Sequence, residues 1–147
     1  MPKKRLGQNF LYDPSILIRI LEAAHLAQED TVVEIGPGPG RMTSMLADRV
    51  KRVIAIELDK TLYGRLVDDL SGRENIGLVQ GDALEYRYDV LDEFKVVANI
   101  PYYITTPILF TLLKHRGRLR SITITLQKEV RPGSLQAREE RTTGFFP

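Results

Sequence analysis

Residues that could bind a nucleotide-like ligand occur in short motifs that follow apolar runs. The first motif is Glu34-Ile-Gly-Pro-Gly-Pro-Gly40, in which Gly36 and Gly38 follow a β-branched run. Glycines there permit a tight turn and a close approach of the backbone to a ligand, and the first amides of a following helix are free to bind it. A dinucleotide fingerprint would need a glycine at position 41, where Arg41 stands. The spacing of glycines at alternate positions after an acidic residue is more typical of sites for a nucleotide-like methyl donor, and a purely structural turn is the alternative.

Acidic residues at two further strand ends could bind the polar groups of a nucleoside. Glu57 ends an apolar run, and its carboxylate can accept hydrogen bonds from both hydroxyls of a ribose. Asp59 is a local competitor for that role. Asp82, followed by Ala83, could accept a hydrogen bond from the exocyclic amine of an adenine, because an ionised carboxylate is only an acceptor. The alternative for each acid is a solvated side chain or a simple turn.

The most informative motif is Asn99-Ile-Pro-Tyr-Tyr103. An asparagine oxygen and a nearby backbone carbonyl could accept hydrogen bonds from an amino group, while a tyrosine ring stacks on a base. A proline-containing turn with buried tyrosines is the alternative. A further segment, Gly7–Leu11, precedes the first expected helix, where Asn9 could make a polar contact and Leu11 could cover a ligand. Spacing alone does not establish the roles of Asn9 and Leu11.

The elements that must position these motifs alternate along the chain. We expect strands over 31–35, 52–57, 76–79, 95–98 and 121–126, and helices over 13–26, 41–49, 60–70 and 107–115. This alternation predicts a parallel sheet flanked by helices on both faces, and the nearly continuous apolar strands suit a buried parallel sheet. Ligands of such sheets bind beyond the carboxyl ends of the strands, where most of the motifs fall. Residues 131–147 are polar and rich in turn residues, which predicts loop or disorder.

Composition restricts the class of protein. The chain has 147 residues, 43% of them apolar, which fits one domain with a substantial core. It has no cysteine, which excludes disulfides, thiolate metal sites and a cysteine nucleophile and suits a reducing cytoplasm. No run approaches the roughly 18 apolar residues of a membrane span. We therefore expect a cytoplasmic protein without a membrane partner, and a monomer.

The net charge of +2 conceals an uneven distribution. Cations cluster at residues 3–5, and residues 114–147 carry eight basic and three acidic groups. Clustered cations can attract a polyanion such as RNA. Solvated, charged ends of the chain are the alternative, and charge alone does not decide between them.

Five motifs taken together resemble the ribosomal RNA adenine N6-dimethyltransferase family. They are LGQNFL, EIGPGPG, IELD, GDAL and NIPYYITTPILF, in this order and spacing, and the resemblance covers about residues 4–130. It implies a Rossmann-like methyltransferase fold that uses S-adenosylmethionine (SAM) as methyl donor. It also implies dimethylation of adenine N6 in small-subunit rRNA during ribosome biogenesis, with that rRNA or the assembling small subunit as partner.

The resemblance further implies roles for individual residues. The residues that would contact SAM are Asn9, Leu11, Gly36, Gly38, Glu57, Asp82, Ala83 and Asn99. The loop at Gly36 would lie near the methionine part, Glu57 would hold the ribose and Asp82 the adenine amine. Asn99 and Tyr102 would be catalytic, with Asn99 where donor and acceptor meet and Tyr102 stacked on the target adenine. No metal is implied, because the donor already carries a good leaving group.

The chain also departs from the family. We expect residues 1–130 to form a partial SAM-binding domain of about five strands, followed by an unmatched polar tail over 131–147 and no carboxyl-terminal helical domain. A fragment of a longer enzyme, inactive on its own, is the resulting hypothesis. The alternative is a non-catalytic RNA-binding or ribosome-assembly module that retains the fold. A nicotinamide-dependent oxidoreductase is a weaker alternative, because Arg41 and the Asn99 motif both disfavour it.

Overall fold

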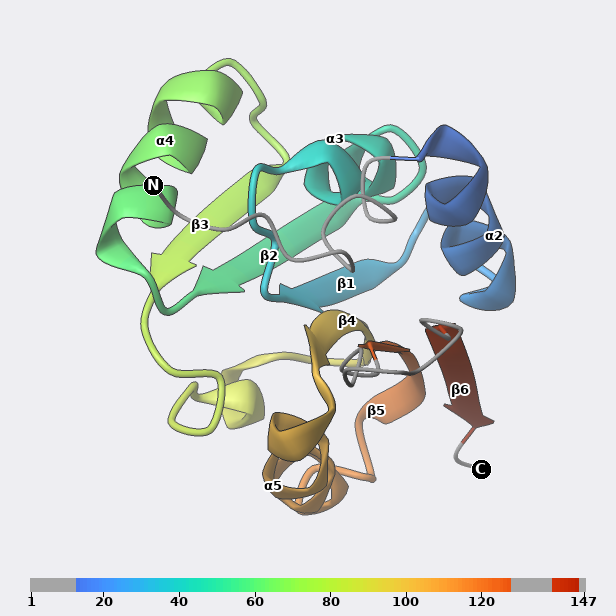
Figure 1. Ribbon diagram of the computed structural model, residues 1–147. Helices are drawn as coiled ribbons and strands as arrows, with labels where there is room; N and C mark the ends of the chain where they lie inside the picture. Colours follow the sequence, from blue (N-terminus) through green and yellow to red (C-terminus); the bar gives the residue numbers. More distant parts are fainter. Residues whose placement is uncertain (1–12, 128–138, 146–147) are drawn as a thin grey trace, which may run out of the picture.

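A six-stranded sheet forms the centre of the molecule, in the order β3-β2-β1-β4-β5-β6 (Figure 1). The computed structural model describes residues 13–127 and 139–145. The strands are β1 (Thr31–Ile35), β2 (Arg52–Glu57), β3 (Ile76–Gln80), β4 (Phe94–Pro101), β5 (Leu119–Gln127) and β6 (Glu139–Phe145). The first five pair in parallel, and β6 pairs antiparallel with β5. The predicted parallel α/β sheet is therefore confirmed.

Helices cover both faces of this sheet. They are α2 (Pro14–Ala23), α3 (Arg41–Ala47), α4 (Lys60–Leu70), the short 3-10 helix η1 (Tyr88–Val90) and α5 (Tyr102–Leu113). Figure 1 shows α2, α3 and α4 on one side of the sheet and α5 on the other. Because side chains alternate along a strand, neighbouring residues enter different cores. Val32 of β1 packs with α2 and α3, whereas Val33 packs with α5 and η1.

The start of α2 follows from its first residues. The Asp13 carboxylate accepts a hydrogen bond from the Ser15 amide at 2.9 Å, and Pro14 occupies the first helical position, where its missing N–H costs nothing. Ile16 and Ile20, one helical turn apart, are buried against the sheet. The helix ends at Ala23, three residues before the predicted end.

Two expectations about elements were wrong. Helix α5, predicted over 107–115, begins at Tyr102 and not at Pro107: Pro101 is at its N-cap position and Pro107 lies inside it. A proline at that position removes one internal hydrogen bond but need not start the helix.

The other error concerns the carboxyl-terminal tail, where residues 139–145 form the strand β6 instead of loop. In the described part of the chain, this antiparallel strand joins the five parallel strands that the sequence predicts. The pairing runs from Ser121 opposite Phe145 to Gln127 opposite Glu139. The rest of the predicted loop lies outside the described residues.

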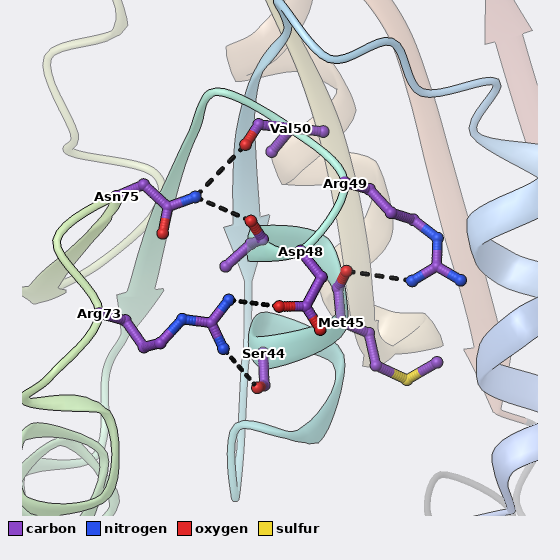
Figure 2. Close-up of polar contacts among 8 residues, drawn as sticks. Ser44, Met45, Asp48, Arg49, Val50, Arg73 and Asn75 are labelled. Carbon is purple, nitrogen blue, oxygen red and sulfur yellow. Dashed lines mark hydrogen bonds and ion pairs between the residues drawn. The ribbon is translucent and has the colours of Figure 1, made fainter.

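Polar contacts fix the far end of α3 (Figure 2). The Arg73 guanidinium donates to the Asp48 carboxylate at 2.6 Å and to the Ser44 hydroxyl at 3.2 Å. The Asn75 side-chain amide donates to two backbone carbonyls at the end of α3 and the turn after it, at 2.8 and 3.3 Å. These bonds tie α3 to the segment that joins α4 to β3, so the other end of α3, at the glycine-rich loop, is held as well.

Within the described ranges, no helix combines the length and the apolar character that a membrane crossing requires.

Candidate functional site

The strand order reverses between β1 and β4, since β2 and β3 lie on one side of this pair and β5 and β6 on the other. Ligands of open parallel sheets bind beyond the carboxyl ends of the strands at such a reversal. Here β4 also extends past β1. The last β1–β4 pair is Ile35 with Ala98, whereas Asn99 to Pro101 pair only with β5. Asn99 therefore lies where the glycine-rich loop leaves the sheet.

The glycine-rich loop approaches its neighbours too closely for side chains at two positions. Gly36 has φ +74°, and a Cβ placed on it would lie 3.0 Å from the backbone oxygen of Asn99. Gly40 has φ +89°, and its Cβ would lie 2.7 Å from Leu66 Cδ2 of α4. Gly38 also has a positive φ, +56°, but open space surrounds it. Space therefore restricts Gly36, which faces backbone, more than Gly40, whose nearest neighbour is the end of the flexible Leu66 side chain, and the middle of the loop faces an opening.

The carboxylate of Glu57 is fixed at the end of β2. This residue is only 6% exposed. Its Oε1 accepts a hydrogen bond from the Gly38 amide at 3.2 Å, and its Oε2 accepts one from the Asp59 amide at 2.9 Å. An ionised carboxylate has about four lone-pair sites, so each oxygen can still accept one hydroxyl. Its orientation is therefore set in advance for a diol such as a ribose.

Asp59, the competitor for that role, has another task. Its Oδ1 accepts hydrogen bonds from the amides of Thr61 and Leu62 at 2.8 and 3.0 Å, which caps the start of α4. Asp59 is therefore engaged in capping α4, whereas the Glu57 carboxylate keeps open acceptor positions.

The segment after β3 lies beside the end of β2. The Gly81 amide donates to the backbone oxygen of Glu57 at 2.9 Å. Asp82 is half-buried, and its Oδ1 accepts the Leu84 amide at 2.8 Å. Ala83 is buried, and its carbonyl accepts the Tyr88 hydroxyl at 2.7 Å. Hydrogen bonds thus hold the turn that contains Asp82, and its carboxylate can still accept hydrogen bonds from a ligand.

A pocket of about 70 Å³ adjoins the loop. It brings together three of the predicted residues, Gly36, Gly38 and Asn99. Tyr102 is not among the lining residues. It is the first residue of α5, three positions after Asn99, and it is 64% exposed. Asn9 and Leu11 lie outside the described residues.

Sequence reasoning did not place Glu34 in the site, although it lines the same pocket. Glu34 is 2% exposed, and its Oε1 accepts a hydrogen bond from the Thr43 hydroxyl of α3. The pKa of Glu34 is raised to about 7, because burial raises it more than the hydrogen bond from Thr43 lowers it, and the nearby Glu57 carboxylate adds a smaller rise. The signal in the sequence was an acid inside the otherwise apolar run Thr31–Ile35.

This buried acid gives the stability of the fold a pH dependence. A carboxyl that is harder to ionise in the folded chain than in the unfolded chain favours folding at low pH, and this contribution is lost as the pH rises through the folded pKa of about 7. We expect the free energy of unfolding of the wild type, relative to Glu34→Gln, to fall by about 3 kcal/mol between pH 5 and pH 8. Urea unfolding at both pH values measures this change. An equal difference at both would show that Glu34 does not titrate in this range.

The sequence of the chain is similar to proteins of one family. Residues 2–142 match the family model described as ribosomal RNA adenine dimethylase. The ribosomal RNA small subunit methyltransferase A of Moorella thermoacetica is 47% identical over 142 residues, which are 88% of this chain and 49% of the relative. The protein of the same name from Clostridium botulinum (strain Okra / Type B1) is 47% identical over 131 residues, which are 86% and 48% of the two chains. This chain thus spans about half the length of the curated relatives it matches.

Solved structures agree with the sequence comparison. The 23S rRNA methyltransferase ErmE is 36% identical, with a TM-score of 0.73 over 78% of this chain and 46% of that one. A dimethyladenosine transferase from Plasmodium falciparum is 33% identical, with a TM-score of 0.70 over 79% of this chain and 42% of that one. Both likenesses again cover less than half of the other protein.

Proposed function

Because the chain belongs to the ribosomal RNA adenine dimethylase family, we propose that it supplies the donor site and the target-base contacts for N6-dimethylation of adenine in small-subunit rRNA. One observation carries this proposal. The ends of four neighbouring strands bring the glycine-rich loop, Glu57, Asp82 and Asn99 to one edge of the sheet, at the reversal of strand order. The family supports a cytoplasmic role on rRNA or on the assembling small subunit.

The residues at this edge suit a SAM-like donor. Glu57 would accept the ribose hydroxyls, and Asp82 the exocyclic amine of the donor's adenine. The loop at Gly36, which has no room for a side chain, would lie against the methionine part. SAM would supply an electrophilic methyl group on its sulfonium. The chain's residues therefore need mainly to bind and orient the donor and the target base, and less to activate them.

Asn99 and Tyr102 would act on the target adenine. The lone pair of its N6 is delocalised into the ring, which makes the nitrogen a poor nucleophile. The Asn99 side-chain oxygen and the Ile100 carbonyl would accept hydrogen bonds from the N6 amino group. These bonds would favour a pyramidal nitrogen that faces the methyl group. Such alignment can supply roughly 7–11 kcal/mol of the acceleration. The exposed Tyr102 ring would stack on the extruded base and contribute about 1–3 kcal/mol to holding it.

Donor binding is tested with two variants of Asp82. Asp82→Ala removes an ionised acceptor, and we expect the dissociation constant for SAM to rise about 10-fold or more. Asp82→Asn is the matched variant: its oxygen can still accept the Leu84 amide and keep the turn, but its amide group faces the adenine amine as a second donor. We expect it to lose affinity with little change in thermal stability. Calorimetric titration with SAM that finds unchanged affinity in both variants would refute the assignment.

The reaction itself is tested by methyl incorporation. With this chain extended by the carboxyl-terminal half of the Moorella thermoacetica relative, labelled SAM should label adenine in small-subunit rRNA, with large-subunit rRNA as the comparison. A non-catalytic RNA-binding module would bind RNA without labelling it, and this result would replace the proposed enzyme with that alternative.

A further inference from the structure

Among residues 13–125, the strongly exposed aromatic rings all lie on α5. Tyr102, Tyr103 and Phe110 are 64, 65 and 66% exposed. The other tyrosines and phenylalanines of residues 13–125 are buried or half-buried: Tyr63, Tyr86, Tyr88 and Phe94. Large rings gain much from burial, so three of them exposed on one helix indicate a contact surface.

The spacing of these residues places them on the side of α5 that faces away from the sheet. Residues 103, 107, 110 and 114 recur every three or four positions, so they share one face. Ile108 and Leu112 occupy the opposite face and are buried in the core. We call Tyr103, Pro107, Phe110 and Lys114, which are all exposed, the outer face of α5. With a rise of 1.5 Å per residue it is about 16 Å long.

The charge of this region selects the kind of partner. Residues 102–120 contain four cations and no acidic residue. Arg118 donates to the Leu91 carbonyl at 2.7 Å, and Arg120 pairs with Glu93. Lys114 and Arg116 are exposed, and neither forms an ion pair with an acidic side chain of residues 13–125. A row of exposed aromatic rings followed by exposed cations suits a single strand of nucleic acid, whose bases stack on the rings and whose phosphates attract the cations.

The outer face also continues from the proposed catalytic edge. Helix α5 starts three residues after Asn99 and leads away from that edge on the side of the sheet opposite α2, α3 and α4 (Figure 1). We propose that the outer face of α5 binds the single-stranded RNA next to the target adenine, with bases stacked on Tyr103 and Phe110 and a phosphate at Lys114. This inference rests on the proposed function, because it takes RNA as the substrate.

The test is fluorescence anisotropy of the chain with a labelled adenine-rich RNA of about 12 nucleotides, titrated without SAM. Phe110→Ala and Tyr103→Ala should each raise the dissociation constant about 5- to 150-fold, whereas Phe110→Tyr, which keeps a ring, should stay within about twofold. Val90→Ala is the matched control, because Val90 is also 66% exposed but lies on η1. Both rings are exposed, so thermal unfolding should change little.

The salt dependence of binding tests the cation separately. Lys114→Gln should reduce the slope of log affinity against log salt concentration by about 0.7, the contribution of one phosphate contact on a single strand. Phe110→Ala should leave this slope unchanged.

Three results would overturn the inference. The first is an RNA affinity of both ring variants equal to that of the wild type, and the second is no RNA binding by the wild type. The third is a dimer, seen by sedimentation, that Phe110→Ala dissociates without changing RNA affinity, which would assign this face to a second copy of the chain. Because the RNA titration contains no SAM, its result is separate from the Asp82 titration, which tests the donor site of the proposed function.

Discussion

Replacement of Asn99 by alanine is expected to lower the rate of methyl transfer to adenine about 100-fold or more while leaving the affinity for SAM nearly intact. The magnitude is that of removing one well-placed polar group from a transition state. Alanine removes the side-chain acceptor, but the backbone oxygen of Asn99 stays beside Gly36. The rate would be measured with labelled SAM and small-subunit rRNA, using this chain extended by the carboxyl-terminal half of the Moorella thermoacetica relative.

Asn99→Asp provides the comparison, because the aspartate side chain has the same length and keeps an acceptor oxygen. We expect its rate to fall between those of the wild type and Asn99→Ala. A nearly normal rate in Asn99→Ala would remove this side chain from the mechanism, and a large loss of SAM affinity would make it mainly a donor contact.

Gly36→Ala is expected to abolish SAM binding and to lower the free energy of unfolding by about 2–5 kcal/mol. The left-handed conformation costs a non-glycine residue about 1–2 kcal/mol. A methyl group 3.0 Å from the Asn99 oxygen adds steric strain, which overpacked sites commonly show at about 1–3 kcal/mol. Separation of β1 from β4 would also displace Asn99 from the pocket.

Gly38→Ala is the matched control for this substitution. It has the same sign of φ, but a Cβ at Gly38 would meet nothing within 4 Å. We expect only the backbone cost of about 1–2 kcal/mol. Urea unfolding and SAM titration of both variants give the comparison. Equal losses in the two would show that the close approach of Gly36 to β4 has no energetic importance.

The sequence predicted the regular part of the fold well. The strand of Thr31–Ile35 and the helix of Lys60–Leu70 follow from local patterns, since β-branched runs and caps such as Asp59 act within a few residues. The start of α5 at Tyr102 differs from the prediction, because Pro107 also suits the first turn of a helix. A proline is compatible with a first helical turn and also with an interior position whose neighbours tolerate the missing bond.

The antiparallel strand β6 could not be found from local pattern. Its seven residues include three charged residues and a glycine beside Thr142, Thr143 and Phe145. They form a strand because the edge of β5 offers hydrogen-bond partners. That information lies in a segment more than a dozen residues earlier in the chain. Pairing with an edge depends on tertiary context more than on propensity.

Glu34 shows the same limit at the site. The sequence reveals an acid between apolar residues, but only the fold shows that it is buried, bonded by Thr43 and close to Glu57. Conversely, the grouping of Gly36, Glu57 and Asn99 was predictable, because parallel strands bring their carboxyl ends to one edge.

The two hydrogen bonds that Glu57 makes to separate loops have a thermodynamic consequence. Its side chain accepts the Gly38 amide, and its backbone oxygen accepts the Gly81 amide. Adenosine and methionine are the two fragments of the donor. When one of them binds and immobilises its loop, less conformational entropy of the loops remains to be lost when the other binds, so each would increase the affinity for the other. Such a coupling free energy is reciprocal by necessity.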